Sequence, residues 1–171
     1  MNERIRIRDH GTTLTISYDD CVRYHGRTNI GGVAVGFRVL QKAFADMAIP
    51  LPERERIGFF TAFPGLGVQD AVEMITRAVS RDRYGIDTEH AELRAPEAAA
   101  GRFYFEVSYD DRICKLATRP GAVPEEFIVL GRRCRVGAGS DAEMRRWAEM
   151  KEELAAAVMS AQPDDLFVRL D

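Results

Sequence analysis

The residues with the clearest chemical potential lie in one short segment, Tyr24-His25-Gly26-Arg27-Thr28-Asn29-Ile30-Gly31-Gly32. The pattern predicts a His-Gly turn that leads into a glycine-rich helix start. Unpaired backbone N–H groups and the positive end of the helix dipole would face a ligand placed there. Arg27 can donate bidentate hydrogen bonds, Asn29 offers amide donors and an acceptor, and His25 titrates near neutral pH. These groups suit a small polar or anionic molecule; the alternative is a tight turn with a hydrogen-bonded histidine and surface arginines.

Four residues outside the turn extend this candidate site. Gly31 belongs to the helix start itself, and Arg38 would add positive charge further along the same helix. Gly67 closes a Gly-x-Gly loop before a second predicted helix, which is either a second anion cradle or a simple turn. Asp70 follows at the start of that helix, where a carboxylate either faces the ligand or offsets the helix dipole.

The three cysteines are spaced in a way that excludes two classes of protein. Cys21, Cys114 and Cys134 are odd in number and unpaired in spacing, which argues against a disulfide scaffold and a zinc ribbon. Cys21 lies four residues before His25, so the two would share a face if that segment were helical. Such a pair suggests a thiolate–imidazole site, and the alternative is a buried structural cysteine. Cys134 is expected to be a surface residue between arginines.

Several segments together resemble the FmdE family of formylmethanofuran dehydrogenase subunits, across about residues 15 to 170. Members typically carry His-Gly-His-x-Cys-Pro-Gly, then a glycine-bearing helix with Gly-x-Arg, and later a cysteine shortly before Asp-Ala-Ile. The positions and segments that carry the resemblance here are His25, Gly26, Gly31, Gly36, Arg38, Gly67–Val72, Phe103–Arg119 and Ala161–Phe167. The resemblance implies that Asp70 lies near the His25 turn and that the chain forms homodimers.

The departures from the family pattern bear on its metal, which is generally zinc. Arg27 stands in place of the second histidine, Asn29 and Gly67 in place of the two cysteines, and Ile30 in place of the proline. Zinc prefers thiolate, imidazole or carboxylate ligands, and a protonated guanidinium has no lone pair to offer. Of the ligands that the resemblance implies, only His25 remains. We therefore predict no metal at this site and no zinc ribbon after it, and the sequence names no cofactor.

The hydrophobic pattern predicts the elements that must position these residues. We expect strands over 12–17 and 103–109, the second joined by Asp110-Asp111 to a partner over 113–118, and helices over 30–47, 68–79 and from Ser140 to Pro163. The type of the short apolar run 127–130 stays open. On the last helix, Trp147 is expected in the core or a dimer interface, and Lys151 among the charges of the outer faces. The mixture favours an α+β fold, with a mostly antiparallel sheet packed by helices in one domain over residues 1–171.

Composition excludes further classes of protein. The chain has 171 residues, a formal net charge of −3, 46% hydrophobic and 30% charged residues. That balance is ordinary for a soluble globular protein and rules out a strongly basic nucleic-acid binder, so no nucleic-acid partner is expected. No stretch approaches the ~18 apolar residues of a membrane span, and the N-terminus is not of the secretory kind. We therefore expect no membrane partner and a cytoplasmic location.

Three functions remain open. The first is a ligand-binding or accessory protein that holds a small polar or anionic molecule at the His25–Arg27–Asn29 turn. The second is a small enzyme in which His25 is the general acid or base, with Arg27 and Asp70 assisting. The third is a structural or interaction protein that has lost its metal site.

Overall fold

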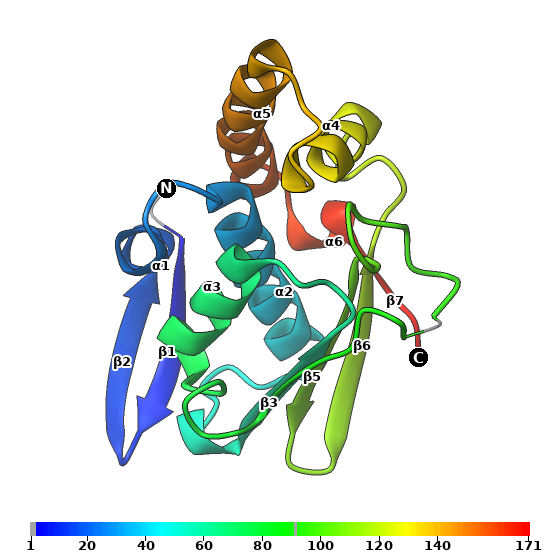
Figure 1. Ribbon diagram of the computed structural model, residues 1–171. Helices are drawn as coiled ribbons and strands as arrows, with labels where there is room; N and C mark the ends of the chain where they lie inside the picture. The colour runs from blue at the N-terminus through cyan, green and yellow to red at the C-terminus, as the bar shows by residue number, and fades with distance from the viewer. Residues whose placement is uncertain (1–2, 91) are drawn as a thin grey trace.

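The computed structural model describes residues 3–90 and 92–171, and its larger sheet has five strands in the order β4-β3-β5-β6-β7 (Figure 1). The strands are β3 (Ile57–Thr61), β4 (Tyr84–Ile86), β5 (Tyr104–Tyr109), β6 (Arg112–Thr118) and β7 (Phe167–Arg169). Only the β3–β4 pair is parallel, so the sheet is mostly antiparallel. A separate antiparallel ribbon is formed by β1 (Arg4–Asp9) and β2 (Thr12–Ser17).

The helices fill the space between the two sheets and extend beyond it. They are α1 (Tyr18–His25), α2 (Ile30–Asp46), α3 (Leu66–Thr76), α4 (Glu125–Arg135), α5 (Asp141–Ser160) and α6 (Pro163–Leu166), with a 3-10 turn, η1, over Arg54–Arg56. In Figure 1, α2 and α3 lie between the β1–β2 ribbon and the larger sheet, whereas α4 and α5 form a hairpin at the top of the view. The fold is α+β, as the sequence predicts. No helix among the described residues is long and apolar enough to cross a membrane.

Most predicted elements are confirmed, with small shifts at their ends. The strand over 12–17 and the β5–β6 hairpin are present, and Asp110 turns the hairpin with a positive φ of 53°. The capping box of Ser140 and Glu143 begins α5. The open run 127–130 is helical, inside α4. The predicted helix over 68–79 begins two residues earlier and ends at Thr76, where Arg77 adopts the left-handed conformation.

The glycines at the starts of α2 and α3 allow the two helix backbones to touch. A Cβ on Gly67 would lie 2.5 Å from the carbonyl oxygen of Asn29, and one on Gly36 would lie 3.1 Å from the Cα of Val68. A Cβ on Gly32 would lie 3.3 Å from the Cα of Gly67. Because backbone cannot move aside as a flexible side chain can, these positions require the absence of a side chain. The glycine-rich start of α2 therefore serves helix packing.

Candidate functional site

The predicted His-Gly turn is present between α1 and α2. α1 begins with a capping box formed by Ser17 and Asp20 and ends at His25, and Gly26 turns the chain with a φ of 83°. Three residues later, Asn29 is the N-cap of α2, but its side chain makes no capping hydrogen bond. Its amide therefore stays available to another partner.

The structure brings His25 and Asp70 together. The Nδ1 atom of His25 lies 2.7 Å from a carboxylate oxygen of Asp70, which α3 presents from its second turn. The His25 side chain is only 6% exposed, while the Asp70 side chain is 32% exposed. The other imidazole nitrogen, Nε2, is buried without a hydrogen-bond partner among the described residues. A carboxylate on Nδ1 orients the ring and leaves Nε2 as its reactive nitrogen.

Other buried groups surround this pair. The hydroxyl of Tyr84 is buried without a partner among the described residues, and burial, with a smaller contribution from the Asp70 charge, raises its pKa. Cys21 lies one turn before His25 on α1 and is fully buried. Burial raises the pKa of its thiol to about 12, with a smaller contribution from the Asp20 charge. A thiol with so high a pKa is not a nucleophile at neutral pH, so Cys21 has the structural role.

The donors around His25 do not fit a zinc ion. Arg27 and Gly67, which stand in place of two expected ligands, supply no thiolate, imidazole or carboxylate, and Asp70 is engaged by Nδ1 of His25. Across residues 3–90 and 92–171, no three His, Cys, Asp or Glu side chains gather closely enough to hold a metal ion. A structural zinc site needs about four such ligands. These side chains therefore do not form the ligand set of a structural zinc site.

A pocket of about 280 Å³ lies on the other side of the α2–α3 contact, below the α4–α5 hairpin. Its walls are mostly apolar and come from the start of α2, the loop before α3, the residue before β5, and α4 and α5. The lining residues are Asn29, Gly31, Gly32, Val35, Phe63, Pro64, Gly65, Leu66, Gly67, Ala99, Phe103, Val123, Phe127, Ile128, Arg135, Trp147, Lys151 and Leu154. A mostly apolar cavity with a few convergent polar groups is typical of a small-molecule site.

The charged groups of this pocket are cationic. Lys151 is half-buried, and its ammonium lies 3.9 Å from the centre of the Trp147 ring. Arg135 lines the exposed mouth. Among the described residues, neither side chain forms an ion pair, and no acidic side chain lines the pocket. Burial lowers the pKa of the Lys151 ammonium, and a smaller contribution from Cys134 opposes this shift.

Two helix N-termini add partial positive charge at the same place. The N-cap residues Asn29 of α2 and Gly65 of α3 both line the pocket, and neither caps its helix through a side chain. Unpaired N–H groups in the first turn of a helix favour an anion. They reinforce the cationic side chains without being a site by themselves.

Six of the seven residues that the sequence singled out fall into three groups. Asn29, Gly31 and Gly67 line the pocket, whereas His25 and Asp70 form the separate pair. Arg27 extends over the surface to Glu152 of α5, with 2.6 Å between their charged atoms.

Arg38 has a structural role instead of the predicted contact with a ligand. It is buried, and its guanidinium donates to the carbonyl oxygens of Val158 and Met159, which fastens the end of α5 to α2. Cys134 also departs from expectation, because it is buried beside Gly139 rather than exposed.

Lys151, Trp147 and Arg135 line one pocket, and their sequence pattern did not predict that they lie together. Trp147 and Lys151 are four residues apart on α5, a spacing that places two side chains on one helix face. That spacing was the available signal, but it is equally typical of a core residue beside a solvated lysine. Arg135, the last residue of α4, gave no comparable signal.

Comparisons with known proteins do not identify a family for this chain. No protein-family model matches the chain, and no curated protein matches it. The function is therefore inferred from the pocket and from the His25–Asp70 pair.

Proposed function

We propose that the protein is a metal-free, divergent relative of the FmdE family of formylmethanofuran dehydrogenase subunits that binds a small anionic molecule. The molecule occupies the pocket beside the His25–Arg27–Asn29 turn, with Asn29, Gly31 and Gly67 at its edge. The observation that carries the proposal is Lys151, a half-buried cation in an apolar pocket with no acidic partner among the described residues.

The physical reason is the cost of partly removing from water a charge that has no anionic partner among the described residues. An ammonium loses hydration on burial, and a hydrogen-bonded anion restores the lost stabilisation. Arg135 at the mouth and the N-termini of α2 and α3 act in the same direction. An anion with an apolar body therefore matches both the charge and the walls of the pocket.

Fluorescence of the single tryptophan tests this proposal directly, because Trp147 lines the pocket. Octanoate is a suitable first ligand, since it is anionic, apolar and transparent where indole absorbs. We expect octanoate to change the emission in a saturable way and Lys151→Met to weaken binding about tenfold, the loss of one charge-assisted hydrogen bond. Arg145→Met is the matched control, because Arg145 is an exposed cation on the same helix but not in the pocket.

Unchanged octanoate affinity in Lys151→Met would contradict the proposed site. The role of the turn is tested separately by His25→Ala combined with Arg27→Ala. We expect this double variant to bind more weakly than the wild type, because Arg27 lies two residues before Asn29 at the pocket edge. Circular dichroism of each variant shows whether the fold is retained.

The His25–Asp70 pair favours a second candidate function, acid–base catalysis by His25. Its Nδ1 is held by a carboxylate and its Nε2 is free of partners among the described residues, as a general base requires. The test is access to Nε2. In a His10→Asn, His90→Asn background, where His25 is the sole histidine, diethyl pyrocarbonate would modify His25 in the native protein if substrates can reach it. Protection until unfolding would sink this candidate.

We also propose that the protein is a homodimer of the cytoplasm. The family resemblance implies the dimer, and exposed apolar side chains at the α4–α5 hairpin, Val129, Val136 and Met144, supply apolar surface for it. The three cysteines are free and buried, as suits a reducing compartment. Light scattering of the purified protein that gives the mass of one chain would contradict the dimer.

A further inference from the structure

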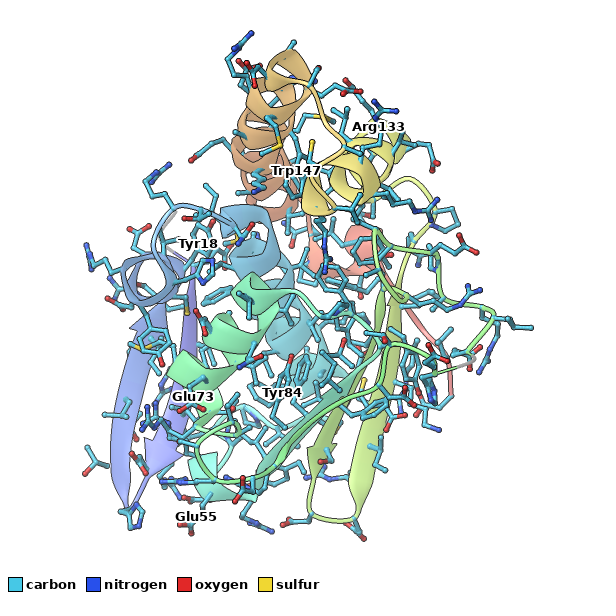
Figure 2. The ribbon with its side chains drawn as sticks, viewed as in Figure 1. Tyr18, Glu55, Glu73, Tyr84, Arg133 and Trp147 are labelled. Carbon is cyan, nitrogen blue, oxygen red and sulfur yellow. The ribbon has the colours of Figure 1, made fainter. Side chains whose placement is uncertain are left out.

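The aromatic side chains of the pocket point to a narrower class of anion. Phe63 and Phe103 form one pair, with ring centres 5.0 Å apart, on the side of the larger sheet. Phe127 and Trp147 form a second pair, with ring centres 6.2 Å apart, from α4 and α5. Figure 2 shows Trp147 between these two helices. The pocket therefore has an aromatic pair in each of the two parts of the fold that enclose it, and aromatic rings favour offset or tilted contacts with another ring.

The size of the pocket limits the ligand. A cavity of about 150 Å³ in a protein core holds one benzene ring. A volume of about 280 Å³ is therefore enough for two fused rings, or for one ring with a short acid-bearing chain. It is too small for a ligand as large as a dinucleotide, whose pockets lie at the upper end of the ~300–1,000 Å³ range.

The ammonium of Lys151 occupies the place that a ligand ring would take. It lies over the face of Trp147, where the π electrons attract a cation in the absence of an anion. A ring stacked on Trp147 displaces the ammonium from that face toward a carboxylate on the same ligand. Arg135 lines the same pocket and can donate to the second carboxylate oxygen. One ligand can thus stack on the indole ring of Trp147 and pair with the ammonium of Lys151 at the same time.

We propose that the ligand is an aromatic carboxylic acid of one or two rings, with its ring between the two aromatic pairs and its carboxylate on Lys151 and Arg135. This inference rests on the proposed function and deepens it, because it adds the ring to the charge. An aliphatic anion pairs with Lys151 but makes no ring contacts. An aromatic amide makes the ring contacts but has no charge to pair with Lys151.

Calorimetric titration with three compounds separates the two contributions. The compounds are 2-naphthoate, its neutral counterpart 2-naphthamide, and octanoate. We expect 2-naphthoate to bind at least tenfold more tightly than either of the others. Lys151→Met is expected to bring 2-naphthoate down to the affinity of the amide, whereas Arg145→Met leaves all three unchanged. Phe127→Leu is expected to weaken 2-naphthoate and 2-naphthamide but not octanoate.

The outcomes distinguish this inference from the proposed function. Octanoate that binds as tightly as 2-naphthoate, and loses affinity in Lys151→Met, overturns the aromatic class and leaves the anion site standing. Affinities for both anions that are unchanged by Lys151→Met overturn the proposed function as well. Equal affinity for 2-naphthoate and 2-naphthamide also counts against both, because the carboxylate would then contribute nothing.

Discussion

Two regions lie on opposite sides of the α2–α3 contact, and they differ in whether a titratable side chain has an acidic partner. Beside α1, His25 is almost fully buried and its Nδ1 is held at 2.7 Å by Asp70. Below the α4–α5 hairpin, Lys151 is half-buried in an apolar pocket and has no acidic partner among the described residues. Both regions contain a titratable group next to the same pair of helices, but only one of them supplies its counter-charge from within the chain.

The difference separates a role inside the fold from a role toward a ligand. A buried polar group that is paired costs little and fixes the geometry around it, whereas a partly buried charge without a counter-charge costs free energy that a bound anion can restore. Asp70 supplies that pairing for Nδ1 of His25, so the pair connects α1 to α3 and leaves only Nε2 without a partner among the described residues. Lys151 lacks a counter-charge among the described residues, and this is why we place the ligand there.

The largest effect is expected at the glycine contact that separates the two regions. Gly67→Ala would place a Cβ 2.5 Å from the carbonyl oxygen of Asn29 and 2.8 Å from the backbone nitrogen of Val33. Since backbone atoms must shift, we expect a loss of about 3 kcal/mol in the free energy of unfolding. Urea denaturation measures this loss.

Gly85→Ala is the matched control, because its Cβ would meet only the ring of Phe60, at 3.0 Å, and a side chain can move. A Gly67→Ala variant as stable as the control would show that the two helices can separate freely. The pocket and the His25–Asp70 pair would then have to be described as movable relative to each other.

The second effect concerns stability at alkaline pH, and it arises at Cys21, in the region of the His25–Asp70 pair. Burial raises the pKa of the Cys21 thiol to about 12 from an ordinary value of 9.0. Between pH 9 and 12 the folded protein therefore binds a proton that the unfolded chain has released, and its stability falls as the pH rises. The contribution of Cys21 is complete well below pH 9 and decreases by about 3 kcal/mol by pH 11.

Cys21→Ala tests this effect, because it removes the titration while keeping a small apolar side chain in place. We expect the free energy of unfolding of this variant to decline less steeply from pH 9 to pH 11 than that of the wild type. Cys114→Ala is the comparison, since burial raises the pKa of the Cys114 thiol only to about 11. Parallel pH profiles for wild type and Cys21→Ala would show that the Cys21 thiol is accessible to water.

The sequence was a good guide wherever local pattern decides the structure. The alternation in 103–109, the capping box at Ser140 and the apolar face of 30–47 each correspond to an element of the structure. α1 was missed, although Ser17 and Asp20 form a capping box, because the helix has only eight residues and a single fully buried one, Cys21. Short helices are stabilised mainly by tertiary packing, which a periodic pattern does not reveal.

The candidate site was predictable only in part. Asn29, Gly31 and Gly67 were chosen because glycines and a helix start attract anions, and they do line the pocket. The sequence placed the positive charge on Arg27 and Arg38, whereas in the structure Arg27 bonds Glu152, Arg38 fastens α5, and the cations that line the pocket are Lys151 and Arg135. Lys151 is more than 100 residues away from the turn in sequence, and its place depends on how α5 packs on α2, so its spacing from Trp147 could not by itself place it beside the turn.

A smaller loss of stability is expected when the carboxylate of Asp70 in the His25–Asp70 pair is neutralised. Asp70→Asn keeps the shape of the side chain but weakens the hydrogen bond to Nδ1 of His25. We expect a loss of about 1 kcal/mol in the free energy of unfolding, the usual contribution of one hydrogen bond. Octanoate affinity should stay the same, because Asp70 does not line the pocket. A change in affinity without a change in stability would reverse the roles assigned to the two regions.

The smallest effect on stability is expected at Glu152. A substitution there is also the sharpest test of the difference between the His25–Asp70 region and the Lys151 pocket. Its carboxylate pairs with Arg27 on the surface, and exposed pairs contribute only about 0–1 kcal/mol. Glu152→Gln should therefore leave the free energy of unfolding nearly unchanged while it releases a further cation next to the pocket. We expect tighter octanoate binding at low ionic strength, and an equal affinity for variant and wild type at about 1 M salt, where screening acts within ~3 Å. If the gain persisted in high salt, the added attraction would not come from an exposed charge, and Arg27 would have to enter the pocket itself. The double variant Glu152→Gln, Arg27→Met tests this explanation. If Arg27 lies inside the pocket, the double variant loses the gain in octanoate affinity at every ionic strength.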